Sequence, residues 1–212
     1  MTDDVLAADG RVIGARAQAT RRRLLDATAK LLDEHGVLDL KVIDVTREVG
    51  TSPATFYQYF ADVDAAILAL SIEAGDDEAP LQRHFATSWT GEDGLDRARA
   101  FVDDFIAHWR EHQAVLRVRN LKAEENDPPF RTARRQANLA IIEKMMTMVV
   151  EGQRAGRIAE VVDPFAAAAG MLAMAERLLT YEREIVQRGT TPHALRETMA
   201  TLIYETLTGR SA

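Results

Sequence analysis

Four consecutive residues, Ser52, Pro53, Ala54 and Thr55, have the chemistry of a helix start that approaches a polyanion. Serine is a preferred N-cap, and proline costs nothing at the first helical position. The first turn of a helix carries unpaired N–H groups and a partial positive charge, which suit a phosphate. The small side chains allow close approach of the backbone to base edges, and Thr55 suits a base or a thymine methyl group.

The aromatic residues that follow divide into two groups. Phe56 and Phe60 are four residues apart, so they share a helix face, which we expect to pack into a core. Tyr57 and Tyr59 have the reach to hydrogen-bond phosphates beside a groove, and Gln58 has the amide that pairs with adenine. The alternative for both tyrosines is a half-buried ring with a solvated hydroxyl group.

A basic segment precedes this region. The protein has a net charge of −7, yet no acidic residue lies between residues 11 and 23. The five arginines of this segment are Arg11, Arg16, Arg21, Arg22 and Arg23. A basic arm on an otherwise acidic chain is typical of phosphate binding, and the alternative is a solvated tail.

A third group, His108, Glu111 and His112, matches the His-x-x-Glu-His pattern of a class of zinc proteases. Such a site needs a further ligand, and the neighbouring Phe105 and Trp109 have the spacing of core residues. A helical metal-dependent hydrolase using these three residues is therefore the alternative function. No other catalytic pattern was found, so we expect a protein that is not an enzyme and that needs neither cofactor nor metal.

The elements that position these residues have helical periodicity throughout. Gly36 and Gly50 are expected to end two helices, and Asp163–Pro164 and Thr191–Pro192 to begin two others. The expected helices span approximately residues 21–35, 42–49, 53–60, 63–70, 95–109, 114–121, 130–155, 164–188 and 192–208. This predicts an all-α protein with about nine helices.

The composition restricts the class of protein further. The 212 residues include no cysteine, which excludes disulfides and thiolate chemistry. The longest uncharged apolar stretch, residues 164–175, is shorter than the ~20 residues of a membrane helix, and the N-terminus has no signal-peptide pattern. We therefore expect a cytoplasmic protein without a membrane partner.

The stretch from Val45 to Phe60, VTREVGTSPATFYQYF, resembles the DNA-binding domain of the tetracycline-repressor (TetR) family. In that family a Gly-bounded helix precedes the pattern Ile-Ala-x-x-Ala-Gly-Val-Ser-x-Gly/Ala-Thr-Phe/Leu-Tyr-x-His/Tyr-Phe. The resemblance covers residues 16–70. The positions that recur in register include Gly50, Ser52, Thr55, Tyr57 and Phe60.

The chain also departs from the family pattern. Lys41 replaces a common Thr or Ser, and Val63 replaces a Lys that touches a phosphate in many members. Lys41 or the Arg21–Arg23 cluster is expected to substitute for that contact. The other departures are Thr46 and Val49 in place of Ala, and Thr51 in place of Val.

The resemblance implies a helix-turn-helix regulator, most simply a repressor of a palindromic operator on double-stranded DNA. The implied layout is a flexible arm (1–15), a three-helix DNA-binding domain (16–61) and a helical regulatory domain (62–212), with the helix from residue 62 as a lever between them. The expected DNA-contacting residues are Arg21, Arg22, Arg23, Lys41, Ser52, Pro53, Ala54, Thr55, Tyr57, Gln58 and Tyr59.

The regulatory domain is expected to form a homodimer and to bind a small hydrophobic effector. Small residues between Phe165 and Ala175 allow close approach of helices, and two helices paired with their symmetry mates give an isologous four-helix interface. The alternative is burial in the monomer core. The expected interface residues are Phe165, Ala169, Leu172, Leu195, Met199 and Ile203. The expected pocket residues, for which plain core is the alternative, are Phe101, Phe105, Trp109, Met145 and Met148.

Overall fold

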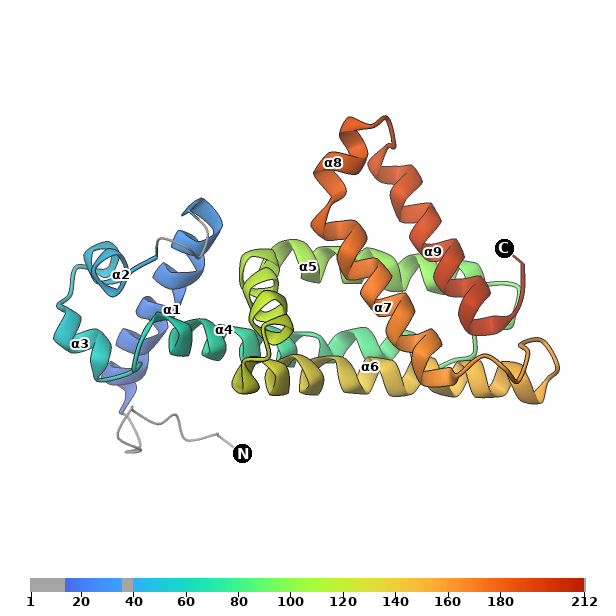
Figure 1. The fold of residues 1–212 in the computed structure, drawn as a ribbon, viewed down its shortest axis with the longest axis horizontal. Helices are drawn as coiled ribbons and strands as arrows, with labels where there is room; N and C mark the ends of the chain where they lie inside the picture. The colour runs from blue at the N-terminus through green and yellow to red at the C-terminus, as the bar shows by residue number, and fades with distance from the viewer. Residues whose placement is uncertain (1–13, 36–39, 212) are drawn as a thin grey trace. The chain divides into compact units, whose positions relative to one another are not determined.

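The computed structural model describes residues 14–35 and 40–211 (Figure 1). Within these residues there are nine α-helices, one 3-10 helix and no β-strand, which confirms the predicted all-α fold. The elements in chain order are α1 (Ala15–His35), α2 (Val42–Val49), α3 (Pro53–Tyr57), α4 (Val63–Asp77), the 3-10 helix η1 (Ala79–Phe85), α5 (Gly94–Glu124), α6 (Pro128–Arg154), α7 (Pro164–Thr180), α8 (Glu182–Gln187) and α9 (Pro192–Thr208). Gly36 and residues 1–13 of the expected arm lie outside the described residues.

The chain divides into two compact units. Unit 1 comprises the described residues up to Gly75 together with His112–Arg134, and unit 2 comprises Asp76–Glu111 and the chain from Arg135 onward. The units therefore do not divide between residues 61 and 62, where the sequence suggested a boundary. Three helices, α4, α5 and α6, continue from one unit into the other.

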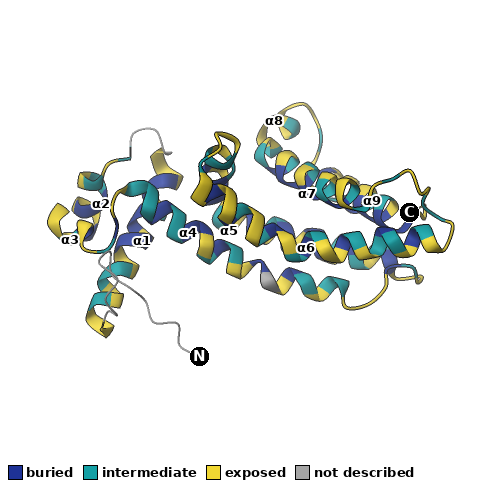
Figure 2. Ribbon diagram, turned by 60° about the horizontal axis from the view of Figure 1, so that its bottom comes forward, coloured by how far each residue is buried: buried dark blue, intermediate teal, exposed yellow. Residues whose placement is uncertain are grey.

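The core of unit 1 explains why α4 and the α5–α6 turn belong to it. Buried side chains from α1, α2, α3 and α4 form one hydrophobic cluster. Figure 2 colours the buried residues dark blue along the ribbon. Val115 and Val118 of α5 and Phe130 of α6 are part of the same cluster, each at most 5% exposed. The other fully buried members are Leu24, Leu25, Val45, Phe56, Ala66 and Ile67. The core of the helix-turn-helix is therefore completed by apolar side chains of α5 and α6, which are distant in the sequence.

Unit 2 is held by an aromatic cluster and by ion pairs between helices. The Phe85 ring stacks on Trp89 with centroids 5.1 Å apart, and Phe101 meets Phe85 edge-on at the same distance. The Trp89 indole N–H donates to the His84 carbonyl oxygen at 2.7 Å. Helices α7 and α9 pack against each other. Arg196 of α9 pairs with Asp103 of α5 through two hydrogen bonds, which fixes α9 to α5.

The helix boundaries differ from the sequence prediction in several places, and α1 and α4 are longer than expected, since α1 begins at Ala15 and α4 ends at Asp77. Residues 95–121 form part of one helix, α5, because Arg110–Gln113 contains neither Gly nor Pro and continues the helix. The helix expected to reach residue 188 is divided at Tyr181 (φ −105°, ψ 13°) into α7 and α8. Helix α3 ends at Tyr57 rather than Phe60, and residues 79–85 form η1, which was not expected.

Two helix starts follow the prediction. The Asp163 carboxylate accepts the Ala166 N–H at 2.8 Å, and the Thr191 hydroxyl oxygen accepts the Ala194 N–H at 3.1 Å. Proline follows each cap directly, as expected for the first position of a helix. Among the described residues, no helix combines the length and apolarity that crossing a membrane requires.

Candidate nucleic-acid interface

The short helix α3 is fixed at its start by Ser52. The Ser52 Oγ accepts the Thr55 N–H at 3.2 Å, and it lies 3.0 Å from the Thr55 hydroxyl oxygen. Phe56 is fully buried and packs against Phe60, with ring centroids 5.6 Å apart. The predicted cap and the predicted core pair are therefore both present, and they hold α3 in one orientation on unit 1.

The turn between α2 and α3 depends on Gly50. This residue has φ 71° and ψ 41°, a left-handed conformation that a side chain disfavours. The Thr51 N–H donates to the Thr46 carbonyl oxygen at 2.9 Å, and the Gly50 N–H donates to the Arg47 carbonyl oxygen at 3.2 Å. These bonds satisfy the last carbonyls of α2 and set the direction in which α3 leaves the turn.

Most of the residues predicted to contact DNA on α3 lie on the surface. The Tyr57 side chain is 53% exposed, although large aromatic residues are usually covered. Thr55 and Tyr59 are half-buried. The remaining exposed members of the predicted set are Ser52, Pro53, Ala54 and Gln58. Helix α3 and the residues on either side of it therefore present small, hydroxyl and amide groups to the outside.

The three arginines of the predicted basic cluster instead make contacts within unit 1. The Arg23 guanidinium donates to the Val49 carbonyl oxygen at 2.7 Å and so ties α1 to the end of α2. Arg22 donates to Glu73 at 2.6 Å and to Asp26 at 2.7 Å. Partial burial lowers the pKa of Arg22, but the hydrogen bonds and charges of Glu73 and Asp26 outweigh it and raise the pKa.

Arg21 is likewise engaged. Its guanidinium lies 5.2 Å from the centroid of the Phe60 ring and 3.7 Å from the Glu73 carboxylate. All three side chains thus have intramolecular partners that the sequence pattern did not indicate, because Glu73, the partner of Arg21 and Arg22, and Val49, the partner of Arg23, are distant along the chain. Their role as phosphate contacts stays a prediction.

Two exposed cations belong to α2 and its N-cap. Lys41 is exposed, and its backbone N–H donates to the Asp44 carboxylate at 3.2 Å. Arg47 was not in the predicted set, yet its side chain is 73% exposed and its contact with Asp44 is long, at 3.4 Å. Helical spacing alone could have found Arg47, since at 3.6 residues per turn it lies on the side of the helix opposite to the apolar Val42, Val45 and Val49.

The start of α4 is capped by Asp62, whose carboxylate accepts the Ala65 N–H at 2.7 Å. Asp64, two residues later, accepts a 2.5 Å hydrogen bond from Lys122 of α5. That hydrogen bond and the charge of Asp64 outweigh desolvation, and the pKa of Lys122 is raised. Both partners belong to unit 1, so this ion pair fastens the α5–α6 turn to the helix that follows α3.

Comparison with known families decides the class of this protein. The family model described as "Tetracyclin repressor-like, C-terminal domain" matches residues 82–212, which are more than half of the chain. The model described as "Bacterial regulatory proteins, tetR family" matches residues 24–70. The chain belongs to the TetR family. TetR-family proteins are DNA-binding transcriptional regulators, and the resemblance stated from the sequence is confirmed.

Individual TetR-family proteins resemble the chain at lower identity. The HTH-type transcriptional regulator BetI of Brucella anthropi is 29% identical in a 154-residue alignment that covers 66% of this chain and 74% of BetI. The fatty acid degradation regulator FadR from Bacillus halodurans has the same fold, with a TM-score of 0.65 and 16% identity over 91% of this chain and 96% of FadR. FadR from Bacillus subtilis, solved in complex with stearoyl-CoA, has a TM-score of 0.63 and 13% identity over 89% and 98% of the two chains.

The predicted interface residues of this TetR-family protein divide between surface and interior. Phe165 is 54% exposed and Ala169 is half-buried. The other four are at most 5% exposed within the single chain, and their place in a dimer interface stays a prediction: Leu172, Leu195, Met199 and Ile203. The helical periodicity of α7 and α9 identified the face that carries the larger apolar residues, and this face packs into the interior of the chain. The face left outside carries the smaller residues Ala166, Gly170 and Ala173.

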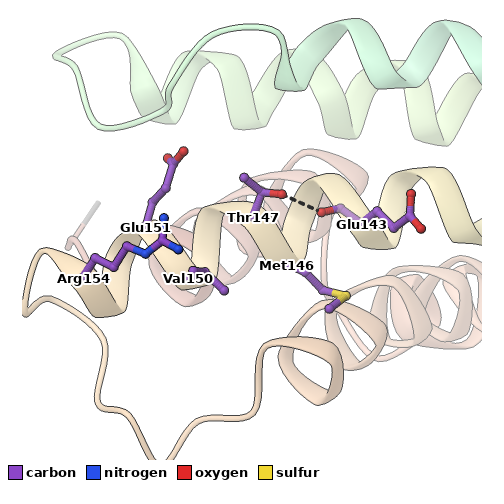
Figure 3. A pocket seen from close by; sticks show the side chains of 6 residues that line it. All are labelled: Glu143, Met146, Thr147, Val150, Glu151 and Arg154. Carbon is purple, nitrogen blue, oxygen red and sulfur yellow. Dashed lines mark hydrogen bonds between the residues drawn. The ribbon is translucent and has the colours of Figure 1, made fainter.

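The predicted pocket residues form part of the packed interior of unit 2. Phe101, Phe105, Trp109 and Met145 are each at most 4% exposed, and Met148 is half-buried. None of them lines the surface depression of about 410 Å³ on α6, shown in Figure 3. Its lining residues are Glu143, Met146, Thr147, Val150, Glu151 and Arg154. The location of an effector site therefore stays a prediction.

The His108, Glu111 and His112 group lies on α5 in mixed surroundings. His108 is buried, with Nε2 3.5 Å from the Glu78 carboxylate, whereas Glu111 is exposed and His112 is half-buried. In residues 14–35 and 40–211, no three His, Cys, Asp or Glu side chains are placed to hold a metal ion together. Nothing in this geometry favours the hydrolase alternative.

Proposed function

We propose that this TetR-family protein is a cytoplasmic homodimeric repressor that binds a palindromic operator and is released by a small hydrophobic effector. The single observation that carries the proposal is α3, a capped helix anchored by the buried Phe56 with Tyr57 and Gln58 on its outward side. A helix of a helix-turn-helix places such residues against base edges and flanking phosphates.

A palindromic site requires two copies of α3 related by a two-fold axis, so the proposal includes a dimer. Its support in the chain is the outward face of α7 and α9, where small residues on α7 accompany Phe165 and the 41%-exposed Leu202. Helices with small residues at their contact approach closely, as in a four-helix interface.

Release by an effector needs a path from unit 2 to the DNA-binding helices. Helices α4, α5 and α6 cross from one unit into the other without interruption, so we assign the transmission to all three rather than to α4 alone. The stearoyl-CoA complex of Bacillus subtilis FadR is consistent with a hydrophobic effector. An effector that weakens operator binding must itself bind less tightly when DNA is present, by the same factor.

The test is selection of genomic fragments on the purified full-length protein. The wild type is expected to enrich a palindrome. Tyr57→Ala is expected to lose most of the affinity for it, and Tyr57→Phe, which lacks only the hydroxyl group, an intermediate amount. Tyr181→Ala, at a 41%-exposed tyrosine of unit 2, serves as the control and is expected to bind normally. Failure of the wild type to enrich any sequence refutes the proposal, and normal binding by Tyr57→Ala refutes the role of that residue.

A further inference from the structure

Glu73 of α4 holds two of the three arginines that the sequence assigns to the DNA interface. Its carboxylate accepts a 2.6 Å hydrogen bond from the Arg22 guanidinium and lies 3.7 Å from the Arg21 guanidinium. The three side chains are partly open to solvent, with exposed fractions of 38% for Glu73, 47% for Arg22 and 22% for Arg21. The contact is therefore an ion-pair cluster at the surface, where a competing anion can reach it.

This cluster joins the predicted interface to α4. The Arg21 guanidinium lies over the Phe60 ring, 5.2 Å from its centroid, and Phe60 directly follows Tyr59 of the predicted contact set. On the other side, Glu73 lies two residues before Gly75, the last residue of α4 that belongs to unit 1. The ion pairs of Glu73 therefore link the residues next to α3 with the part of α4 that continues into unit 2.

We propose that Glu73 competes with operator phosphates for Arg21 and Arg22, so that the two arginines exchange their carboxylate partner for the DNA backbone when the protein binds. This inference rests on the proposed function. A carboxylate and a phosphate are both anions that a guanidinium binds through charge-assisted hydrogen bonds, so one can replace the other. Ion pairs at an exposed position are weak, so breaking this one requires little free energy.

The exchange makes the operator affinity depend on the position of α4. While Glu73 lies beside α1, a phosphate contact of Arg21 or Arg22 requires the loss of an ion pair within the protein. A movement of α4 that withdraws Glu73 leaves both guanidinium groups available to DNA. By linkage, DNA that captures the arginines loosens α4 from α1 by the same free energy. Glu73 is thus a positioning residue that sets the operator affinity without touching DNA.

The neighbouring partners of the arginines do not provide this link. Asp26 accepts a 2.7 Å hydrogen bond from Arg22, but it lies one turn away on α1 itself and moves with the arginine. Arg23 donates to the backbone carbonyl oxygen of Val49, which carries no charge. Within residues 14–35 and 40–211, the carboxylate that reaches Arg21 and Arg22 from another helix is that of Glu73.

The test compares the full-length wild type with Glu73→Gln on the operator that the wild type selects. Glutamine keeps the size of the side chain and can still accept a hydrogen bond from Arg22, so the change removes the charge and retains the fold. Glu73→Gln is expected to bind the operator about two- to fivefold more tightly per subunit at low salt, which corresponds to one exposed ion pair. The gain is expected to shrink as salt is raised, because salt screens the ion pair that the substitution removes.

Glu48→Gln is the matched control. Glu48 is 37% exposed, pairs with Lys30 of α1 at 2.6 Å and belongs to the same unit, so its replacement removes an equal charge and a similar ion pair. Lys30 is not among the expected contact residues, and this variant is expected to bind with nearly the wild-type affinity. In a protein that also carries Arg21→Met and Arg22→Met, the gain from Glu73→Gln is expected to disappear.

The inference is overturned if Glu73→Gln binds the operator no more tightly than the wild type, if Glu48→Gln gains as much, or if the gain persists without the two arginines. Each of these results is obtained with a wild type that binds its operator, so it leaves the proposed function intact. A wild type that selects no operator refutes the proposed function itself, and this inference with it.

Discussion

Gly170 allows the proposed dimer to be tested at a position where the single chain tolerates change. It lies within α7 on the outward face, and an added Cβ would meet no atom of the chain within 4 Å. A glycine inside a helix costs about 1 kcal/mol relative to alanine, so Gly170→Ala is expected to stabilise the isolated chain by roughly that amount. Any loss of assembly in a Gly170 variant therefore cannot be attributed to a damaged fold.

Gly170→Arg is the stronger perturbation. A charge buried without a partner costs about 3–5 kcal/mol, which weakens association by roughly a hundred- to several-thousand-fold. An isologous interface contains the substituted position twice, so the effect is incurred in both subunits. The Arg side chain reduces this cost if it can direct its guanidinium to the interface edge, which makes the lower value the safer expectation.

The assay is sedimentation equilibrium of the full-length protein across a wide concentration range. The wild type is expected to have the mass of two chains and Gly170→Arg that of one, with the control Ala107→Arg, at an exposed alanine on α5, remaining dimeric. Gly170→Arg should also lose affinity for a palindromic operator while keeping its affinity for a single half-site. A Gly170→Arg protein that dimerises as tightly as the wild type would refute the choice of the α7–α9 face.

Two further predictions concern stability. Gly50→Ala is expected to lower the free energy of unfolding by about 1 kcal/mol, because the left-handed backbone, rather than a clash, opposes the new Cβ. Urea denaturation measures this change, with Gly14→Ala, whose added Cβ also meets no atom, as the control. Equal stabilities of the Gly50→Ala and Gly14→Ala proteins would contradict the assignment. Hydrogen bonds from His84 and Arg83 keep the pKa of Asp104 below its ordinary value despite desolvation. A carboxyl with a depressed folded-state pKa stabilises the protein above its unfolded pKa and loses that contribution as pH falls through the folded value. Asp104→Asn should therefore lower stability at neutral pH and lessen the decline of stability below about pH 4; an unchanged pH profile would show that this pair contributes nothing.

Local sequence signals predicted the turn between α2 and α3 and the start of α3 correctly. Ser52, Pro53 and Gly50 each act through the backbone within four residues, so their types alone indicated a cap, a first turn and a left-handed helix end. The continuous α5 was missed because polar residues at 110–113 interrupt the apolar pattern without breaking the helix. Propensity favours continuation through such a segment when neither Gly nor Pro is present.

The environment of a side chain proved harder to predict than its helix. Arg22 pairs with Glu73, and Lys122 pairs with Asp64; both partners are more than fifty residues away, so no local pattern indicates them. Periodicity placed Leu172 and Met199 on apolar faces but gave no means of deciding whether such a face meets the chain itself or a second copy. That choice depends on the packing of all the helices together.

The discontinuity of unit 1 has a consequence for modularity. A fragment that ends at Gly75 lacks Val115, Val118 and Phe130, so the hydrophobic cluster that these side chains help to form is incomplete and part of its apolar surface is exposed. The helix-turn-helix part of this protein therefore cannot be transferred to another protein as an N-terminal fragment alone. A chimaera that exchanges operator specificity between relatives must carry the segment His112–Arg134 with the first four helices, or redesign the apolar surface where the two meet.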